Sequence, residues 1–181
     1  AQIEKDLTEA IAVLPPTIPA SEYGRFTKGS AKALLGKVYL YEGKNAQAAE
    51  LLAEVNGPTP GGISIYGYKL LTHFSDLWVV ANKFNSESIL EASHTNQGLT
   101  GWGNWGQSSD EGNSVCVMVG PRGYSRIDTT KATPDLPSGW SFNVFTQDFY
   151  DAIKNDPRFS ATVLDMKALS DEGKASYIEG Y

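Results

Sequence analysis

Aromatic and glycine residues crowd one irregular stretch of the chain, between about residues 95 and 145. Trp102, Asn104 and Trp105 lie close together within it, and glycines flank both indoles. The face of an aromatic ring stacks on the apolar C–H face of a sugar, while amide and guanidinium groups form directional hydrogen bonds with hydroxyls. These residue types predict a site for a sugar-like ligand. The candidate ligand-binding residues are Trp102, Asn104, Trp105, Arg122, Tyr124 and Trp140.

A structural role would explain the same tryptophans. Large aromatic side chains dominate packing wherever a long loop is anchored onto helices. A connection of this length without periodic structure is uncommon inside a compact domain, and it tends to be functional when it is ordered. From the residues alone, the ligand-binding and the anchoring interpretations both stay open.

Gly101, Gly103 and Gly106 match the G-x-G-x-x-G fingerprint of dinucleotide-binding proteins. That fingerprint works only between a strand and a helix whose N-terminus holds the pyrophosphate. Residues 107–113 are polar and interrupted by glycine, so no helix is expected there. We therefore interpret the match as a chance feature of a loop rich in glycine and tryptophan, and we expect no cofactor.

The sequence predicts no catalytic residue and no metal site. His73 and His94 lie far apart, without a carboxylate at ligand spacing. Cys116 lies in the apolar run 115–119, where a thiolate is disfavoured, and we expect it to be a small buried hydrophobic residue. A glycoside hydrolase would need a pair of carboxylates, and the available ones are better explained as solvated charges or helix-start residues. These carboxylates are Glu87, Glu91, Asp110, Glu111, Asp148 and Asp151.

Composition and charge exclude further classes of protein. The chain has 181 residues, 41% of them hydrophobic, which is ordinary for a globular protein with one core. A net charge of −6 argues against nucleic acid as a partner, because phosphates need a clustered basic surface. No apolar run approaches the roughly 18 residues of a membrane span, and the first residues do not resemble a signal peptide.

The clearest structural element is a helical hairpin over residues 27–60. Apolar residues recur at the i, i+3, i+4, i+7 spacing of one helix face on both sides of a short turn at residues 43–45. The two faces consist of Ala31, Leu34, Leu35 and Val38, and of Ala48, Leu51, Leu52 and Val55. Thr27 is the expected N-cap of the first helix. The spacing fits the tetratricopeptide pattern, in which small residues at Gly36 and Ala48 let the helices approach closely.

The other elements are shorter. We expect helices at residues 3–14 and 146–153, a helical stripe at 70–78, a strand or extended piece at 88–94, and a short helix near 170–177. The predicted fold class is therefore all-α, a tetratricopeptide-like helical scaffold with long irregular loops and little β-structure.

Four segments of the chain resemble the SusD/RagB family. Residues 24–41, GRFTKGSAKALLGKVYLY, are similar to that family's G-R-x-T-K-G-A-A-x-A-L-L-A-K-V-Y-L-Y segment. The family's other elements follow in the expected order: YKLL with a nearby Phe at residues 68–71, N-S-E-x-I-x-E at 85–91, and D-x-R-x-x-A-T at 156–162.

The resemblance implies a fold and a function. It implies a SusD-like α/α superhelix, without catalysis, that binds a glycan on the outer face of the bacterial outer membrane. It also implies delivery of that glycan to a SusC-like TonB-dependent transporter, and a membrane attachment only through a lipid anchor that this chain lacks. Family ligand contacts come from irregular segments after the N-S-E element, where Trp102, Trp105, Tyr124 and Trp140 fall.

Family members are longer than this chain, so we expect an internal fragment of one SusD-like region. We expect a helical part at residues 1–94, a loop-rich ligand-binding part at 95–145 and a C-terminal part at 146–181. The alternative function is a tetratricopeptide-type adaptor that binds a protein or peptide in its helical groove. Exposed aromatics on the concave helix face would favour the adaptor, whereas exposed aromatics in the loop-rich half would favour the glycan binder.

Overall fold

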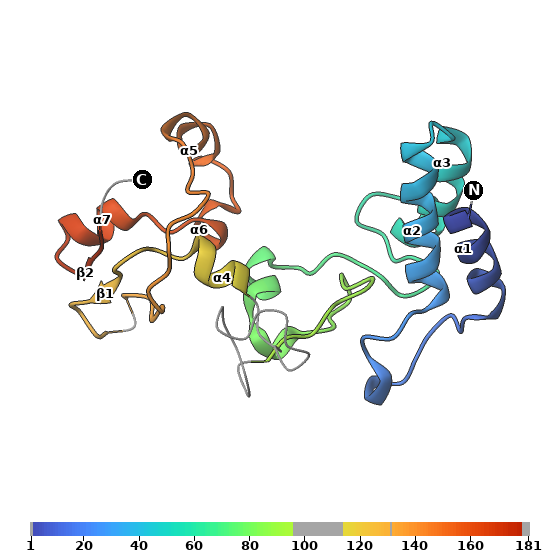
Figure 1. Cartoon of the computed structure of the whole chain (residues 1–181), viewed down its shortest axis with the longest axis horizontal. Helices are drawn as coiled ribbons and strands as arrows, with labels where there is room; N and C mark the ends of the chain where they lie inside the picture. The colour runs from blue at the N-terminus through green and yellow to red at the C-terminus, as the bar shows by residue number, and fades with distance from the viewer. Residues whose placement is uncertain (1, 96–113, 131, 179–181) are drawn as a thin grey trace. The chain divides into compact units, whose positions relative to one another are not determined.

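The computed structural model describes residues 2–95, 114–130 and 132–178 (Figure 1). The chain divides into two compact units, Ala1–Ser93 and His94–Tyr181, called here the N-terminal unit and the C-terminal unit. The predicted division at residues 94 and 145 stays a prediction. The elements, with 3-10 helices labelled η, are α1 (Gln2–Val13), η1 (Ala20–Glu22), α2 (Lys28–Tyr41), α3 (Asn45–Asn56), η2 (Phe74–Trp78), η3 (Val80–Asn82), α4 (Ser114–Val119), β1 (Ser125–Arg126), α5 (Gln147–Ile153), α6 (Phe159–Thr162), α7 (Met166–Asp171) and β2 (Ala175–Ser176).

The helical hairpin predicted for residues 27–60 is present as α2 and α3. Thr27 caps α2 as predicted, because its Oγ1 accepts a hydrogen bond from Ser30 N at 3.2 Å. Ser30 Oγ accepts a hydrogen bond from Thr27 N at 2.8 Å in return. The reciprocal cap satisfies two backbone donors at the helix start. Gly43, with a φ of 73°, supplies the left-handed turn after α2, and α3 begins two residues later.

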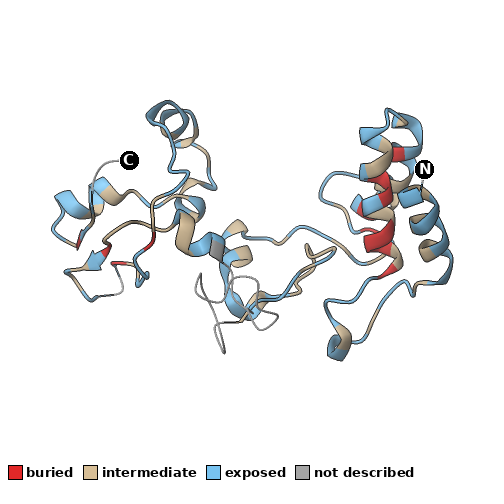
Figure 2. Ribbon diagram, in the orientation of Figure 1, coloured by how far each residue is buried: buried red, intermediate tan, exposed pale blue. Residues whose placement is uncertain are grey.

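The core of the N-terminal unit lies between α2 and α3. Leu35 on α2 is buried, as are Ala48 and Val55 on α3 (Figure 2). A Cβ added to Gly36 would lie only 2.8 Å from Leu52 Cγ. The missing side chain at Gly36 therefore lets the two helices approach closely, which confirms the role predicted for the small residues.

The first predicted helix is α1, which packs against α2. Glu4 on α1 forms an ion pair with Lys44, with an Nζ–Oε2 distance of 2.9 Å, and Glu42 forms a second at 2.8 Å. The Glu42 and Glu4 carboxylates together hold the pKa of Lys44 above its usual value. Oppositely charged groups thus join α1 to the turn between α2 and α3.

In the rest of the N-terminal unit, side-chain carboxylates bond to backbone N–H groups, beside backbone hydrogen bonds such as that from Lys69 N to Ser86 O. Glu87 Oε1 accepts a hydrogen bond from Leu71 N at 2.6 Å, and Glu91 Oε2 accepts one from Phe84 N at 2.9 Å. Residues 88–94 belong to no strand, so of the predicted strand or extended piece the strand is excluded. The two carboxylates thus satisfy backbone donors of two other segments of the unit.

The α2 cap is also tied to a distant part of the unit. Thr27 Oγ1 lies 3.2 Å from the Tyr68 hydroxyl, within hydrogen-bonding distance. Beyond Tyr68, the helical stripe predicted at residues 70–78 forms only the 3-10 helix η2. Because the cap carries contacts to both α2 and this segment, its removal should affect more than one helix end.

We predict that Thr27→Ala lowers the free energy of unfolding of the N-terminal unit by about 1 to 2 kcal/mol, the upper part of the range for losing an N-cap. Chemical denaturation, with hydrogen exchange of the α2 amides, measures the change. Thr8→Ala is the control, because Thr8 is exposed within α1 and bonds only to the carbonyl of Glu4 in its own helix. A loss no larger for Thr27→Ala than for Thr8→Ala would contradict the assigned cap.

In the C-terminal unit, helices and turns surround one small sheet. β1 and β2 pair antiparallel, with Ser125 opposite Ser176, and they form the only sheet among the described residues. The helix predicted at residues 146–153 is confirmed as α5, where Thr146 Oγ1 accepts a hydrogen bond from Phe149 N at 3.3 Å. The predominance of helix over strand agrees with the predicted fold class.

Two predictions for the C-terminal unit are wrong. The helix expected near residues 170–177 begins earlier, as α7, and Gly173 ends it with a φ of 69° before β2 starts. Lys174 N donates to Leu169 O at 2.9 Å, a pairing typical of a helix that stops at glycine. Cys116 is exposed, not buried, because the apolar run in which it lies forms the short helix α4, whose residues point in several directions.

No helix in the described ranges is long and apolar enough to cross a membrane.

Candidate functional site

The predicted ligand-binding residues fall into two groups. Trp102, Asn104 and Trp105 lie outside the described residues. Arg122, Tyr124 and Trp140 lie in the described part of the C-terminal unit, between α4 and α5. The structure therefore shows the surroundings of Arg122, Tyr124 and Trp140 only.

A compact set of hydrogen bonds joins residues 117–122 to residues 139–142, and we call it the clasp. Arg122 N donates to Ser141 Oγ at 2.8 Å, and four backbone N–H groups of the second segment donate to carbonyls of the first. The four bonds run from Gly139 N to Pro121 O (2.8 Å), Trp140 N to Val117 O (2.9 Å), Ser141 N to Gly120 O (2.8 Å) and Phe142 N to Met118 O (2.7 Å). The clasp brings Arg122 and Trp140, far apart in the sequence, into one region.

Two glycines allow the clasp to close. A Cβ added to Gly139 would lie 2.5 Å from the Cα, C and O atoms of Gly120. A Cβ added to Gly120 would lie 3.3 Å from Gly139 Cα and 3.0 Å from the carbonyl oxygen of Cys116. The two chain segments therefore cross backbone to backbone, at a distance that only glycine allows at residue 139.

The clasp holds an aromatic pair. The ring centroids of Trp140 and Phe142 lie 5.6 Å apart, and the ring planes are inclined by 60°. Trp140 is half-buried, whereas Phe142 is 42% exposed. Ser141 and Asn143, on either side of Phe142, have φ values of 55° and 57°. Residues other than glycine rarely adopt this left-handed conformation, and backbone strain of this kind is enriched at binding sites.

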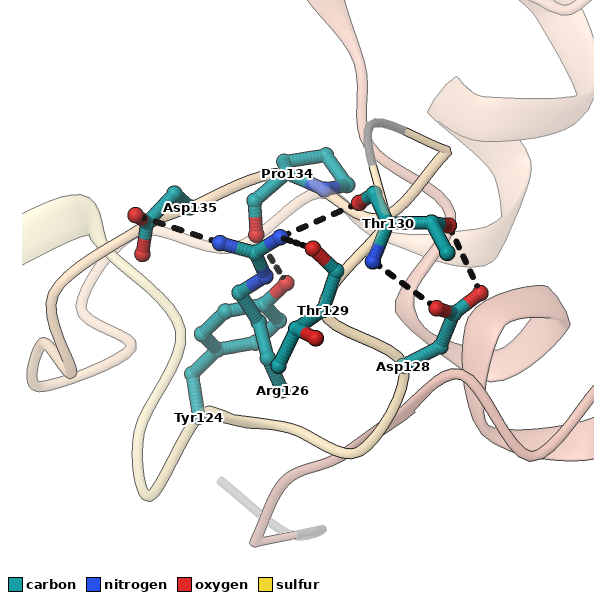
Figure 3. A network of polar contacts seen from close by, with 7 residues as sticks. All are labelled: Tyr124, Arg126, Asp128, Thr129, Thr130, Pro134 and Asp135. Atoms are coloured by element: carbon teal, nitrogen blue, oxygen red, sulfur yellow. Dashed lines mark hydrogen bonds and ion pairs between the residues drawn. The ribbon is translucent and has the colours of Figure 1, made fainter.

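Tyr124 has a supporting position. Its side chain is buried, and its hydroxyl donates a hydrogen bond to the carbonyl oxygen of Pro134 at 2.5 Å (Figure 3). A buried ring with an occupied hydroxyl presents little surface on which a sugar could stack. Contact between Tyr124 and a ligand stays a prediction, and its geometry favours a role in fixing the loop that precedes Trp140.

The same loop carries a polar network that the sequence analysis missed (Figure 3). Arg126 Nη2 donates to the carbonyl oxygens of Thr129 (2.7 Å) and Thr130 (3.0 Å), and Nη1 lies 3.1 Å from Asp135 Oδ2. The carboxylate of Asp128 accepts hydrogen bonds from N and Oγ1 of Thr130 at 2.8 and 2.9 Å. The bond from Thr130 N lowers the pKa of Asp128. An arginine followed closely by Asp-Thr-Thr was the signal that could have predicted this turn.

The carboxylates considered for hydrolysis have structural partners where the structure describes them. Glu87 and Glu91 accept backbone hydrogen bonds in the N-terminal unit, and Asp151 forms an ion pair with Lys154 at 2.8 Å. In the described ranges, no three His, Cys, Asp or Glu side chains are grouped so that they could hold a metal ion. The aromatic pair of the clasp is suited to holding a ligand by stacking.

A groove of about 870 Å³ with aliphatic, aromatic and polar walls also lies in the C-terminal unit. Its apolar walls include Val119, Val144, Val163, Leu164, Met166 and Ile178. Ser141 and Asn143 line it, whereas Trp140 and Phe142 are not among its lining residues. Phe145, Tyr150 and Tyr177 also line the groove, so it offers aromatic surface as well, and the aromatic pair differs from it by containing Trp140, a residue predicted to bind the ligand.

A smaller cavity of about 400 Å³ in the N-terminal unit has mixed aromatic and polar walls. Two of its polar side chains are already engaged: Ser86 Oγ donates to Lys69 O at 3.0 Å, and Ser88 Oγ donates to Glu91 Oε2 at 2.5 Å. None of the predicted ligand-binding residues lines this cavity. The aromatic pair in the clasp therefore remains the best-supported candidate site among the described residues.

Comparison with known proteins assigns the chain to a class. No family model matches it, and no curated protein sequence matches it. The described part of the chain is a helical scaffold, with the α2–α3 hairpin and several short helices joined by irregular segments. The chain belongs to the SusD-like family, since it is 62% identical to a solved laminarin binding SusD-like protein, with a TM-score of 0.91 over 99% of the chain.

A second solved structure has the same fold at lower identity. It is surface glycan-binding protein A from Bacteroides thetaiotaomicron in complex with laminarihexaose, with a TM-score of 0.75 and 23% identity over 98% of the chain. At this identity the likeness shows the fold alone. The chain spans 38% of the length of each of these two proteins. The predicted family and the predicted helical fold class are confirmed.

Proposed function

We propose that the protein to which this chain belongs binds glycans without catalysis. The observation that carries the proposal is the 62% identity with a laminarin binding SusD-like protein along almost the whole chain. Laminarin is a β-1,3-linked glucan, so glucans of this linkage are the first ligands to test. The aromatic pair supports the proposal, because sugar recognition needs stacking surfaces.

The proposed site consists of the six residues predicted from the sequence. Trp140 and Arg122 lie together at the clasp, and Trp102, Asn104 and Trp105 are proposed to complete the site. We further propose that the protein acts on the outer face of the outer membrane, held by a lipid anchor, and passes its glycan to a SusC-like TonB-dependent transporter. Family membership supports these two steps.

The adaptor alternative finds less support. Among the described residues, the hairpin helices expose one large aromatic side chain, Tyr41, which lies at the end of α2. The other exposed aromatics lie in loops, in η2 or on α5, and they are Tyr23, Phe26, Trp78, Phe142, Phe145 and Phe149. Of these, Phe142 and Phe145 lie in the loop-rich part predicted to bind the ligand.

Isothermal titration of the full-length protein with a panel of oligosaccharides tests the proposal. We expect Trp102→Ala, Trp105→Ala and Trp140→Ala each to weaken binding by roughly 1 to 3 kcal/mol, as the loss of a desolvated aromatic contact does. Trp78→Ala is the matched control, because Trp78 is exposed in the N-terminal unit and should leave the affinity unchanged. Indifference of the wild-type protein to every glycan in the panel would refute the proposal.

A further inference from the structure

The groove of the C-terminal unit gathers exposed apolar side chains from several parts of that unit. Its walls come from the end of α4, the segment that leads into α5, the segment that joins α6 to α7, and residues 177–178. Contiguous exposed apolar surface marks a place where another segment or molecule packs. The large hydrophobic residues that line the groove and are between 37% and 59% exposed are Val119, Leu136, Val144, Phe145, Leu164 and Ile178.

The described part of the C-terminal unit buries little apolar surface elsewhere. Its buried hydrophobic residues, among those that the structure describes, are Tyr124 and Ala175, and neither lines the groove. A folded unit must bury enough apolar surface to offset the conformational entropy that its chain loses on folding. The cover of the groove is therefore needed throughout the life of the folded unit, which a ligand that dissociates does not provide.

Several polar side chains in the groove already have partners within the C-terminal unit. The Tyr150 hydroxyl donates a hydrogen bond to Asp165 Oδ2 at 2.6 Å. Lys167 Nζ forms an ion pair with Asp171 Oδ2 at 2.7 Å. A ligand pocket orients its ligand through a few polar groups that point at the ligand. Polar groups that bond to one another, between exposed apolar side chains, favour packing by an apolar segment over recognition of a ligand.

We propose that the groove is filled by a segment of the same polypeptide outside residues 1–181, which packs apolar side chains against the walls and completes the core of the C-terminal unit. The two SusD-like relatives have further polypeptide, since residues 1–181 span 38% of their length. Ile178 is the last described residue and a wall of the groove, so polypeptide that continues from it starts beside the groove. Covalent connection gives such a segment a high effective concentration there. The inference does not depend on the proposed glycan binding.

Photo-crosslinking of the full-length protein tests the inference. A diazirine analogue of leucine, which reacts on irradiation with whatever lies against it, replaces Leu164 in one variant and Val144 in another. The analogue is close to leucine in size, so thermal unfolding of the Leu164 variant should match that of the wild type. We expect both positions to become joined to a peptide of the same molecule from outside residues 1–181, identified by mass spectrometry after proteolysis of the monomer.

The matched control places the same analogue at Asp148, which is exposed in the first turn of α5 and does not line the groove. Water should quench the analogue there and leave little or no cross-link. A cross-linked dimer would assign the groove to a second copy of the protein, and a peptide from residues 1–181 would place the cover within the matched part of the chain. Quenching by water at residues 144 and 164 would show an open groove. Each of these three results would overturn the inference, and none of them bears on glycan binding.

Discussion

Leu35→Ala is expected to lower the free energy of unfolding of the α2–α3 hairpin by about 2 to 5 kcal/mol. Leu35 is 3% exposed and lies at the contact between the two helices, beside Ala31 and across from buried residues of α3. Its truncation removes apolar contacts and leaves a cavity that the closely approaching helices cannot fill. Denaturant unfolding combined with hydrogen exchange of the α2 and α3 amides measures the effect.

The neighbouring leucine provides the control for this prediction. Leu34→Ala makes the same chemical change one residue earlier in α2, but Leu34 is 45% exposed and should lose well under half as much stability. Equal effects of the two substitutions would show that α2 packs through a different face from the one described. The comparison is sensitive because helix propensity changes identically at both positions.

Gly139→Ala is expected to lower the free energy of unfolding of the C-terminal unit by about 3 kcal/mol, near the upper end of the usual range for overpacking. The added Cβ would lie 2.5 Å from three atoms of Gly120, and these are backbone atoms that cannot turn aside. The segments must separate, which strains the hydrogen bonds of the clasp. If the proposed function holds, glycan affinity should fall as well, because Trp140 is the next residue.

Gly36→Ala is the matched control for the substitution at Gly139. Its added Cβ would lie 2.8 Å from the end of the Leu52 side chain, which can change rotamer. Alanine also favours helix over glycine by about 1 kcal/mol, which offsets part of the crowding. Thermal unfolding of both variants should therefore rank Gly139→Ala as the more damaging. The reverse order would argue against the backbone crossing.

The sequence predicted the helical hairpin well because its signals are local and agree with one another. Residues 31–55 repeat at the helical period, Thr27 caps the start, and Gly43 supplies the turn. Family resemblance and periodicity also indicate the same segment independently. The capping partner Ser30 and the contact from Thr27 to Tyr68 were not anticipated, since a contact between residues so distant in sequence leaves no periodic trace.

The wrong predictions have specific physical causes. Residues 88–94 were predicted as a strand or extended piece and form no strand, and Glu87 and Glu91 bond to the backbone N–H groups of Leu71 and Phe84. The helix placed near residues 170–177 was displaced because Gly173 was not taken as a terminator. Each of the two real strands has two residues, too few to show an alternating pattern.

The candidate site was predicted by residue type, whereas its geometry could not be predicted. Nothing in the spacing of Arg122 and Trp140 indicates that a crossing of two glycines brings them together. Ser141 and Asn143, on either side of Phe142, have left-handed conformations, which asparagine favours more than most residues but which serine rarely adopts, so the sequence does not predict the pair. Tyr124 was selected as an aromatic residue in a loop, and the structure places it in a buried, supporting position.

The crossing of Gly120 and Gly139 has a consequence for how such proteins can diversify. The segment between Arg126 and Gly139 is fixed at one end by the β1–β2 pair and at the other by the clasp. The free energy of closing a loop rises by only about 0.6 kcal/mol for each doubling of its length. This segment can therefore be lengthened, shortened or exchanged during evolution or design while the aromatic pair keeps its place, so new ligand contacts can be added beside an unchanged platform.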